Sequence, residues 1–248
     1  GIVANLPSAL AGTLELGRTG ALSTAFIIFL LMMSVGVIYF IVFVERAQRR
    51  IIVQYPKRQR GNKMSGGESS HLPLKINTAG VIPPIFASSL LLMPITIIGF
   101  SAGTGPEWLT QAAAYLGRGQ PVYLIIYISM VVFFAFFYTA VVFNPADTAD
   151  NLKKYGGFIP GIRPGKNTAE YIDWVLTRLT VVGAAYLAAI CLLPELLISR
   201  YSVPFYFGGT SLLIVVTVTM DTVAQVQSHL LAHQYEGLIK KSKLRGRR

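Results

Sequence analysis

Charged residues are scarce in this sequence. Only 13% of its 248 residues are Asp, Glu, Lys or Arg, whereas 53% are hydrophobic. About a quarter of the residues of a soluble domain are charged, so this scarcity excludes an ordinary soluble domain. Long uncharged runs take the place of the missing charges, at residues 21–44, 76–106, 121–145, 179–194 and 201–220.

Cysteine and histidine are rare too, which limits the disulfides, metal sites and catalytic sites that the chain could form. Cys191 is the only cysteine, so it forms no internal disulfide, and we predict that it packs within an apolar run. His229 and His233 have the i, i+4 spacing of zinc ligands, but neither an HExxH motif nor a cysteine accompanies them. Residues 155–166, YGGFIPGIRPGK, lack the GxxxxGK[ST] order of a phosphate-binding loop. We predict no metal, no cofactor and no enzyme.

The apolar runs have the length of membrane-spanning helices, which need about 20 apolar residues. Strands of a membrane barrel are shorter and half polar. We therefore predict an all-α, polytopic membrane helix bundle with five transmembrane helices and an N-terminal helix stub. The predicted spans are 21–44, 76–100, 121–143, 174–194 and 205–228, and the stub lies with an outer loop in 1–20. Because the chain begins with Gly inside an apolar segment, we expect an N-terminally truncated fragment.

The basic residues predict the orientation of these spans. Segments 46–75, 153–178 and 240–248 hold eight, five and six Lys or Arg, which is 19 of the 22. With five spans, all three segments fall on the same side of the membrane, and positive charge marks the cytoplasmic side. We predict cytoplasmic loops at 45–75 and 144–173, a cytoplasmic tail at 229–248, and outer loops at 101–120 and 195–204.

The first two cytoplasmic connectors are long, basic and rich in Gly and Pro. In the first, we expect the preceding helix to continue past residue 45 and a hairpin-like arm to turn at MSGGESS, residues 64–70. One interpretation is that the charges only set topology and touch anionic lipid. The other is that loops of about 30 residues contact an anionic partner, such as ribosomal RNA or an acidic protein.

The run NTAGVIPPIFASSLLLMP, residues 77–94, contains three prolines. Pro83 and Pro84 have no amide hydrogen and would free carbonyls one turn back, near Ala79 and Gly80. Such carbonyls are costly when they face lipid. Two interpretations remain open: a kinked helix inside a bundle, or a helix that lines a water-accessible path or forms a moving gate.

Three segments resemble a known family of membrane channels. LPLKINTAGVIPPIFASS, FFYTAVVFNPADTADNLKKYGGFIPGIRPGKNT and VPFYFGGTSLLIVVTVTMD are similar to the SecY family, central subunits of the bacterial Sec protein translocase. The resemblance covers essentially the whole chain, from the end of the family's fifth helix through its tenth. It implies a channel in the bacterial inner membrane that passes unfolded preproteins across and releases apolar segments sideways into lipid.

The resemblance also implies roles for individual residues. Ile85 and Ile214 match positions of the family's apolar pore ring, which seals without binding the passenger strongly. The lateral gate is implied along the proline-bearing span, at Pro83, Pro84, Ser88 and Ser89, with the bend assigned to the two prolines. Docking of the SecA ATPase and the ribosome is implied for the basic loops, at Arg163, Lys57, Arg58, Arg60, Lys63, Lys153 and Lys154.

The implied partners are the SecE and SecG subunits, SecA, the ribosome, signal peptides, nascent chains and membrane lipid. The alternative from the residues alone is half of a secondary transporter. That function would favour an ionisable site at mid-membrane, and Asp221 is the only acid near a span interior.

Overall fold

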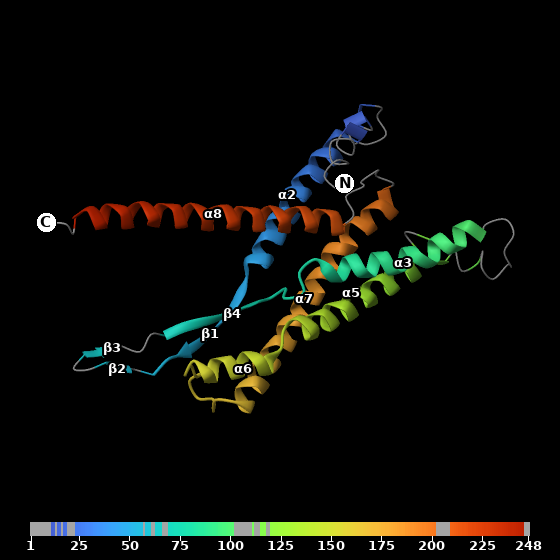
Figure 1. Ribbon diagram of the computed structural model, residues 1–248. Coiled ribbons are helices and arrows are strands. Elements are labelled where there is room, and N and C mark those ends of the chain that lie inside the picture. Colours follow the sequence, from blue (N-terminus) through green and yellow to red (C-terminus); the bar gives the residue numbers. More distant parts are fainter. Residues whose placement is uncertain are drawn as a thin grey trace.

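The computed structural model describes residues 11–12, 14–15, 17–18, 23–56, 58–60, 63–65, 69–101, 111, 115–117, 120–201 and 209–245. Five long helices dominate it (Figure 1): α2 (Thr24–Arg46), α3 (Ile82–Ser101), α5 (Pro121–Val142), α7 (Lys166–Tyr201) and α8 (Gly209–Arg245). Four of them contain segments long and apolar enough to cross a membrane, while the apolar stretch Ile82–Ile97 of α3 is shorter. The predicted helical membrane bundle is confirmed. The predicted stub lies mostly outside the described residues.

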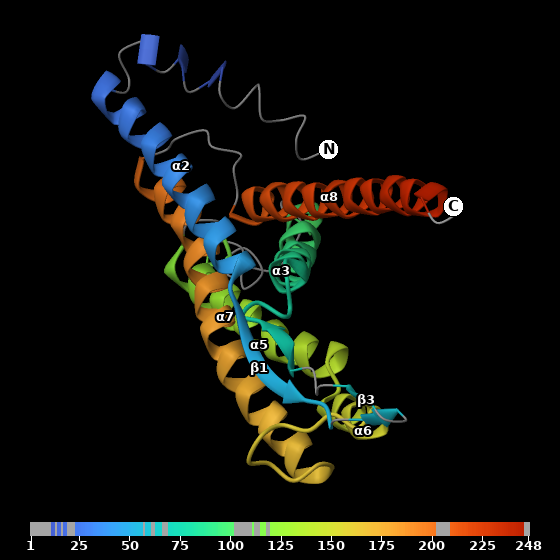
Figure 2. The same ribbon diagram turned by 90° about the vertical axis from the view of Figure 1, so that its left-hand side faces the viewer.

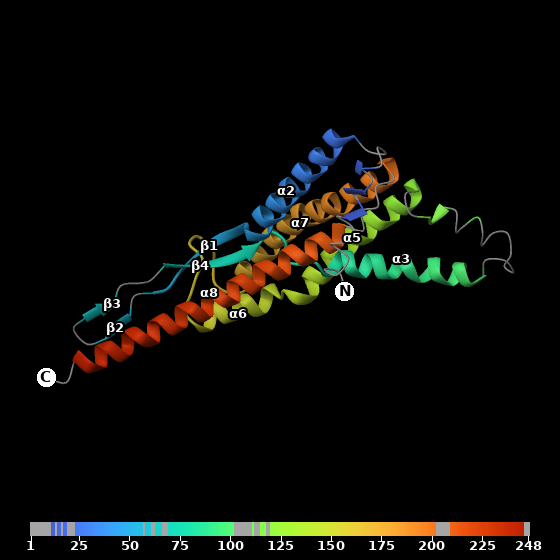
Figure 3. The same cartoon turned by 90° about the horizontal axis from the view of Figure 1, so that it is seen from above.

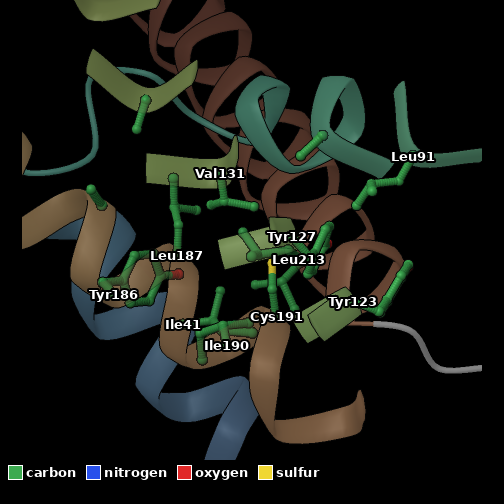
Figure 4. Close-up of a cluster of buried hydrophobic side chains, with 14 residues drawn as sticks. Ile41, Leu91, Tyr123, Tyr127, Val131, Tyr186, Leu187, Ile190, Cys191 and Leu213 are labelled. Atoms are coloured by element: carbon green, nitrogen blue, oxygen red, sulfur yellow. The ribbon is translucent and has the colours of Figure 1, made fainter. Parts of the chain in front are cut away.

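Helix α7 is the centre of the bundle. It packs against α5, α6 and α8, and 56% of its apolar segment is buried, compared with 11% in α2 and α8. The main core gathers side chains from all five long helices, including Ile41, Tyr127, Leu187, Cys191 and Leu213 (Figure 4). Cys191 is 3% exposed, which confirms its predicted packing role. In lipid, the hydrophobic effect does not drive helices together, because their surroundings are already apolar. Close packing of this kind therefore contributes much of the energy that holds them together.

The first basic connector folds as paired strands. β1 (Gln48–Gln54) pairs antiparallel with β4 (Ser69–Lys75), and β2 (Arg58–Arg60) pairs with β3 (Lys63–Ser65). The expected hairpin is therefore present, but its turn is not at 64–70, since Arg60 already faces Lys63. The expected continuation of the helix is also wrong. Helix α2 ends at Arg46, and the β-branched run Ile51–Val53 favours a strand.

The second basic connector contains a short helix and the start of a long one. Asn144 caps α6 (Pro145–Lys154): its side-chain oxygen accepts from the Ala146 amide at 3.0 Å, and Pro145 occupies the first helical position. The Asn-Pro pair thus both ends α5 and begins α6. Helix α7 begins at Lys166, well before the predicted span at 174.

The two adjacent prolines lie in the first turn of α3 and not in its interior, so the predicted bend at these prolines is wrong. Pro83 and Pro84 are in its first turn, where backbone amides have no partner within the helix. Only Pro94 lies in the helix interior. The carbonyl freed by Pro84 is that of Gly80, as the sequence indicated, and the Asn77 side chain donates to it at 3.1 Å.

The basic connectors and the C-terminal end of α8 lie at one end of the molecule. Figures 1 and 3 show the paired strands, α6 and that end of α8 on one side. The ends of α3 and α7 and the beginning of α2 lie on the other. The arrangement of the elements therefore agrees with the prediction that the basic connectors and the tail lie on one side and the other connectors on the opposite side.

Candidate functional site

The two basic connectors form one folded unit, which we call the basic platform and define as β1, β4, α6 and residues 155–165. Gln54 and Phe158 exchange two backbone hydrogen bonds, each 2.9 Å, which join β1 to the second connector. A second apolar core lies beneath this joint, formed by Ile51, Leu74, Ile159, Ile172 and Val175. The sequence predicted two basic loops but gave no indication that they contact each other.

Gly157 allows the two connectors to approach closely. A Cβ atom there would lie 3.0 Å from Tyr55 Cε1, 3.1 Å from Val53 Cγ1 and 3.3 Å from Leu152 Cδ2. Those three side chains come from both connectors, so even a methyl group would push them apart. The glycine is therefore a packing residue of the platform.

Arg163 lies exposed on a turn with a defined backbone. Gly161 and Gly165 have φ values of +83° and +111°, which L side chains rarely adopt. The Thr168 hydroxyl, in the first turn of α7, donates to the Arg163 carbonyl at 3.0 Å. These constraints present the guanidinium from a fixed point at the end of the platform.

The remaining predicted docking residues are distributed over the same end. Lys153 and Lys154 are exposed in the last turn of α6, where cations favour the helix dipole. Arg58 and Arg60 lie in β2 and Lys63 in β3, with side chains outside the described part. Lys57 lies outside the described residues.

Helix α3 has one buried and one exposed face. Pro83, Pro84, Ala87 and Leu91 are buried, and the Phe86 ring stacks on Phe134 of α5 with centroids 5.8 Å apart.

The opposite face carries an exposed stripe. Ile85 is 41% exposed and Ser89, one turn later, is exposed as well; Leu92 and Met93 continue the stripe. Ser88 is half-buried and donates to the Ile85 carbonyl at 3.0 Å. Of the predicted ring and gate residues of α3, Ile85 and Ser89 thus lie on the uncovered side, whereas Pro83 and Pro84 lie on the buried face.

The second predicted ring residue lies on a helix with different neighbours. Ile214 is half-buried on α8, which packs on α2 and α7, whereas α3 packs on α5. Figure 2 shows α8 starting near α2 and α7, with much of its length projecting away from the other helices. The structure places both residues on partly uncovered helices.

A partly buried polar cluster was missed by the sequence analysis. Asn77, 4% exposed, donates to Glu45 Oε1 at 2.7 Å, and the Tyr186 hydroxyl approaches the same oxygen at 3.5 Å. The three residues come from the turn before α3, the end of α2 and the middle of α7. An Asn and a Glu 32 positions apart carry no local signal, so only the tertiary structure reveals the pair.

Apolar spanning helices joined to a folded basic unit define a multi-pass integral membrane protein. The chain belongs to the SecY family, whose model matches residues 1–223. It is 56% identical over 247 residues to protein translocase subunit SecY of Escherichia coli K12, and 54% identical over 245 residues to that of Rickettsia conorii. Each match covers 99% of this chain and 56% of the relative, so the chain spans about half their length.

Two solved structures share the fold. One, described as the structure of a protein conducting channel, has a TM-score of 0.55 with 18% identity, covering 79% of this chain and 48% of that one. The other, from work on the plug domain of the SecY protein, has a TM-score of 0.56 with 19% identity, covering 80% and 49%. The predicted family is confirmed.

Proposed function

We propose that the chain forms about half of a membrane channel that conducts unfolded preproteins and releases apolar segments sideways into lipid. The observation that supports this most strongly is the match of 99% of the chain, at 56% identity, to a protein translocase subunit. The activity belongs to the whole channel, of which this chain supplies the α3 stripe, the partly uncovered α8 and the basic platform.

In this proposal, the exposed stripe of α3 faces the translocation path. Ile85, together with Ile214 of α8, contributes to an apolar constriction, since branched apolar side chains hinder water and ions without binding a passing chain strongly. Ser88 and Ser89 lie on the gate face, while the buried side of α3 stays packed on α5. Opening then moves α3 and α5 together.

The basic platform is proposed as the docking surface for a motor ATPase of the SecA type and for the ribosome. Its exposed cations, Arg163, Lys153 and Lys154, suit an acidic protein surface or ribosomal RNA.

SecE and SecG are the proposed partner subunits. The platform and C-terminus then lie in the cytoplasm and the spans in the bacterial inner membrane. A secondary transporter finds no counterpart among the relatives described above.

A photo-crosslinking amino acid at Ser89 of the full-length protein tests the proposed path. During translocation of a preprotein, we expect crosslinks from position 89 to the signal sequence. The matched control is Val182 of α7, which is 56% exposed but lies on a different helix. Equal crosslinking at both positions, or none at Ser89 during active transport, would contradict the assignment of α3 to the gate.

A further inference from the structure

The turn before α3, residues 76–81, is held firmly by its neighbours. The Ile76 amide donates to the Ala47 carbonyl, just beyond α2, at 3.2 Å. On the other side, a Cβ on Gly183 of α7 would lie 2.7 Å from the Ile76 carbonyl oxygen. Real Cβ atoms do not approach so closely, so only glycine lets the α7 backbone abut this turn. The start of the turn is thus fixed between α2 and α7.

The backbone is less constrained at Gly80, three residues after Asn77. Gly80 has a φ of +65°, and a Cβ there would meet no atom within 4 Å. Its carbonyl lacks the usual helical donor, because residue 84 is proline. Among the described elements, α5 is the only one that packs extensively against α3. Gly80 is therefore the point at which α3 can change direction relative to the fixed turn.

Asn77 connects the fixed turn to this pivot. The same amide nitrogen donates to Glu45 Oε1 at 2.7 Å and to the Gly80 carbonyl at 3.1 Å. The bond to Glu45 is short and charge-assisted, a class about twice as strong as a neutral hydrogen bond. The Tyr186 hydroxyl of α7 donates to Glu45 Oε1 at 3.5 Å, and the Tyr186 ring contacts Phe40 of α2, with ring centroids 5.9 Å apart.

We propose that Asn77 is a positioning residue for the gate: through Glu45 it fastens the start of α3 to α2, so that α3 moves by pivoting at Gly80 about a fixed end. The proposal rests on the proposed function, in which α3 is the gate helix. Without the latch, formed by Glu45 and Asn77, only the contacts of Ile76 would hold the turn, and the resting position of α3 would be poorly defined.

The polarity of the latch can be reversed, which provides a sharp test. Asn77→Asp sets two carboxylates against each other and should raise the population of displaced α3 on the order of tenfold, the effect of about 1.4 kcal/mol. Glu45→Gln keeps an oxygen acceptor for Asn77 and should remain close to wild type. The double variant Glu45→Gln/Asn77→Asp restores a donor and an acceptor in exchanged positions between α2 and the turn, but not the bond to the Gly80 carbonyl. It should therefore return the population part of the way toward wild type.

The readout is the distance distribution between spin labels in the full-length, reconstituted protein, with its other cysteines replaced. Suitable label sites are Met93 on α3 and Val182 on α7, which are 64% and 56% exposed. We expect an added or broadened population for Asn77→Asp alone. A purely structural role of the asparagine would leave the double variant as perturbed as the single one.

An unchanged distribution in Asn77→Asp, or no recovery in the double variant, would overturn the latch. If Asn77→Asp does not assemble, recovery of assembly in the double variant supports the latch, and failure of both overturns it. Preprotein translocation is measured in parallel on the same samples. If the distances change as predicted but even the wild-type protein translocates no preprotein, the proposed function is refuted while the latch stands.

Discussion

At the scale of single residues, two cations near the end of the platform have different surroundings. Lys166 lies 3.9 Å from Glu170, an exposed pair one helical turn apart. Arg163 is exposed three residues earlier, and no ion pair to it occurs among the described residues. Gly161 and Gly165 fix the turn that carries it, so less conformational freedom is lost when a partner binds.

Reversing the charge of Arg163 should therefore be severe. We expect Arg163→Glu in the full-length protein to reduce ATPase-driven export of a preprotein on the order of tenfold or more, because a cation that meets an acidic partner becomes a repelling charge. The membrane level of the channel should not change. In vitro translocation into inverted vesicles measures the effect, with immunoblotting for the amount of channel.

Lys166→Glu is the matched control, since it makes the same charge change three residues away at a cation that already has an intramolecular partner. Its effect should be much smaller, because exposed pairs contribute little. Normal export by the Arg163 variant, or an equal loss in both variants, would rule out a specific docking role for Arg163.

At the scale of elements, α3 combines a packed face with an uncovered one. Its buried residues recur at 83, 84, 87 and 91, and its exposed stripe begins at Ile85. Because the two faces are separate, substitutions on the stripe can change the path without removing the packing on α5. The prolines support this division, since they begin the helix instead of breaking it.

Polar side chains in the proposed constriction should let ions pass. We expect Ile85→Asn and Ile214→Asn each to raise ion conductance of the resting full-length channel about tenfold, with a larger effect together, because an amide hydrates a constriction that branched alkyl groups keep dry. Conductance of single channels in planar bilayers is the measurement.

Leu90→Asn serves as the control, because Leu90 is 51% exposed on the same helix but lies off the stripe. This variant should leave the resting conductance near wild type. A leak from Leu90→Asn equal to that from Ile85→Asn would indicate general loosening of α3. An unchanged conductance in both isoleucine variants would remove these residues from the constriction.

At the scale of the whole molecule, we propose that the membrane boundary lies at a cluster of charged and aromatic residues on α7. The Arg178 guanidinium carbon lies 3.9 Å from the centre of the Trp174 ring, and Tyr171 stacks on the same ring at 6.4 Å. Trp and Tyr are enriched at membrane interfaces, and Arg near a helix end extends toward the headgroups. These residues lie in α7 where it leaves the basic platform.

The ends of α5 should accordingly face opposite compartments. In a full-length protein with its other cysteines replaced, we expect Gln120→Cys to react with a membrane-impermeant maleimide in intact cells. Lys154→Cys should react only in inverted vesicles. Both positions are exposed, and α5 (Pro121–Val142) separates them. Labelling of both from one side would contradict the topology derived from basic residues.

Much of this architecture follows from local properties of the chain. Runs of apolar residues determine spanning helices, because a backbone in lipid must satisfy its own hydrogen bonds. Clusters of Lys and Arg determine the side on which each connector lies. A turn at Arg163 with special backbone angles follows from its flanking glycines. These features depend on residues close together in the sequence, which is why they could be read from it.

The tertiary structure decided what depends on distant residues. Paired strands in the first connector, their joint with Phe158, and the bond from Asn77 to Glu45 all link segments that no periodicity relates. The double proline shows the difference most clearly: the sequence determined that a carbonyl near Gly80 would lose its donor. Only the folded chain decided that a nearby asparagine satisfies it while also binding a second helix, because that geometry requires α2, α7 and the turn to meet.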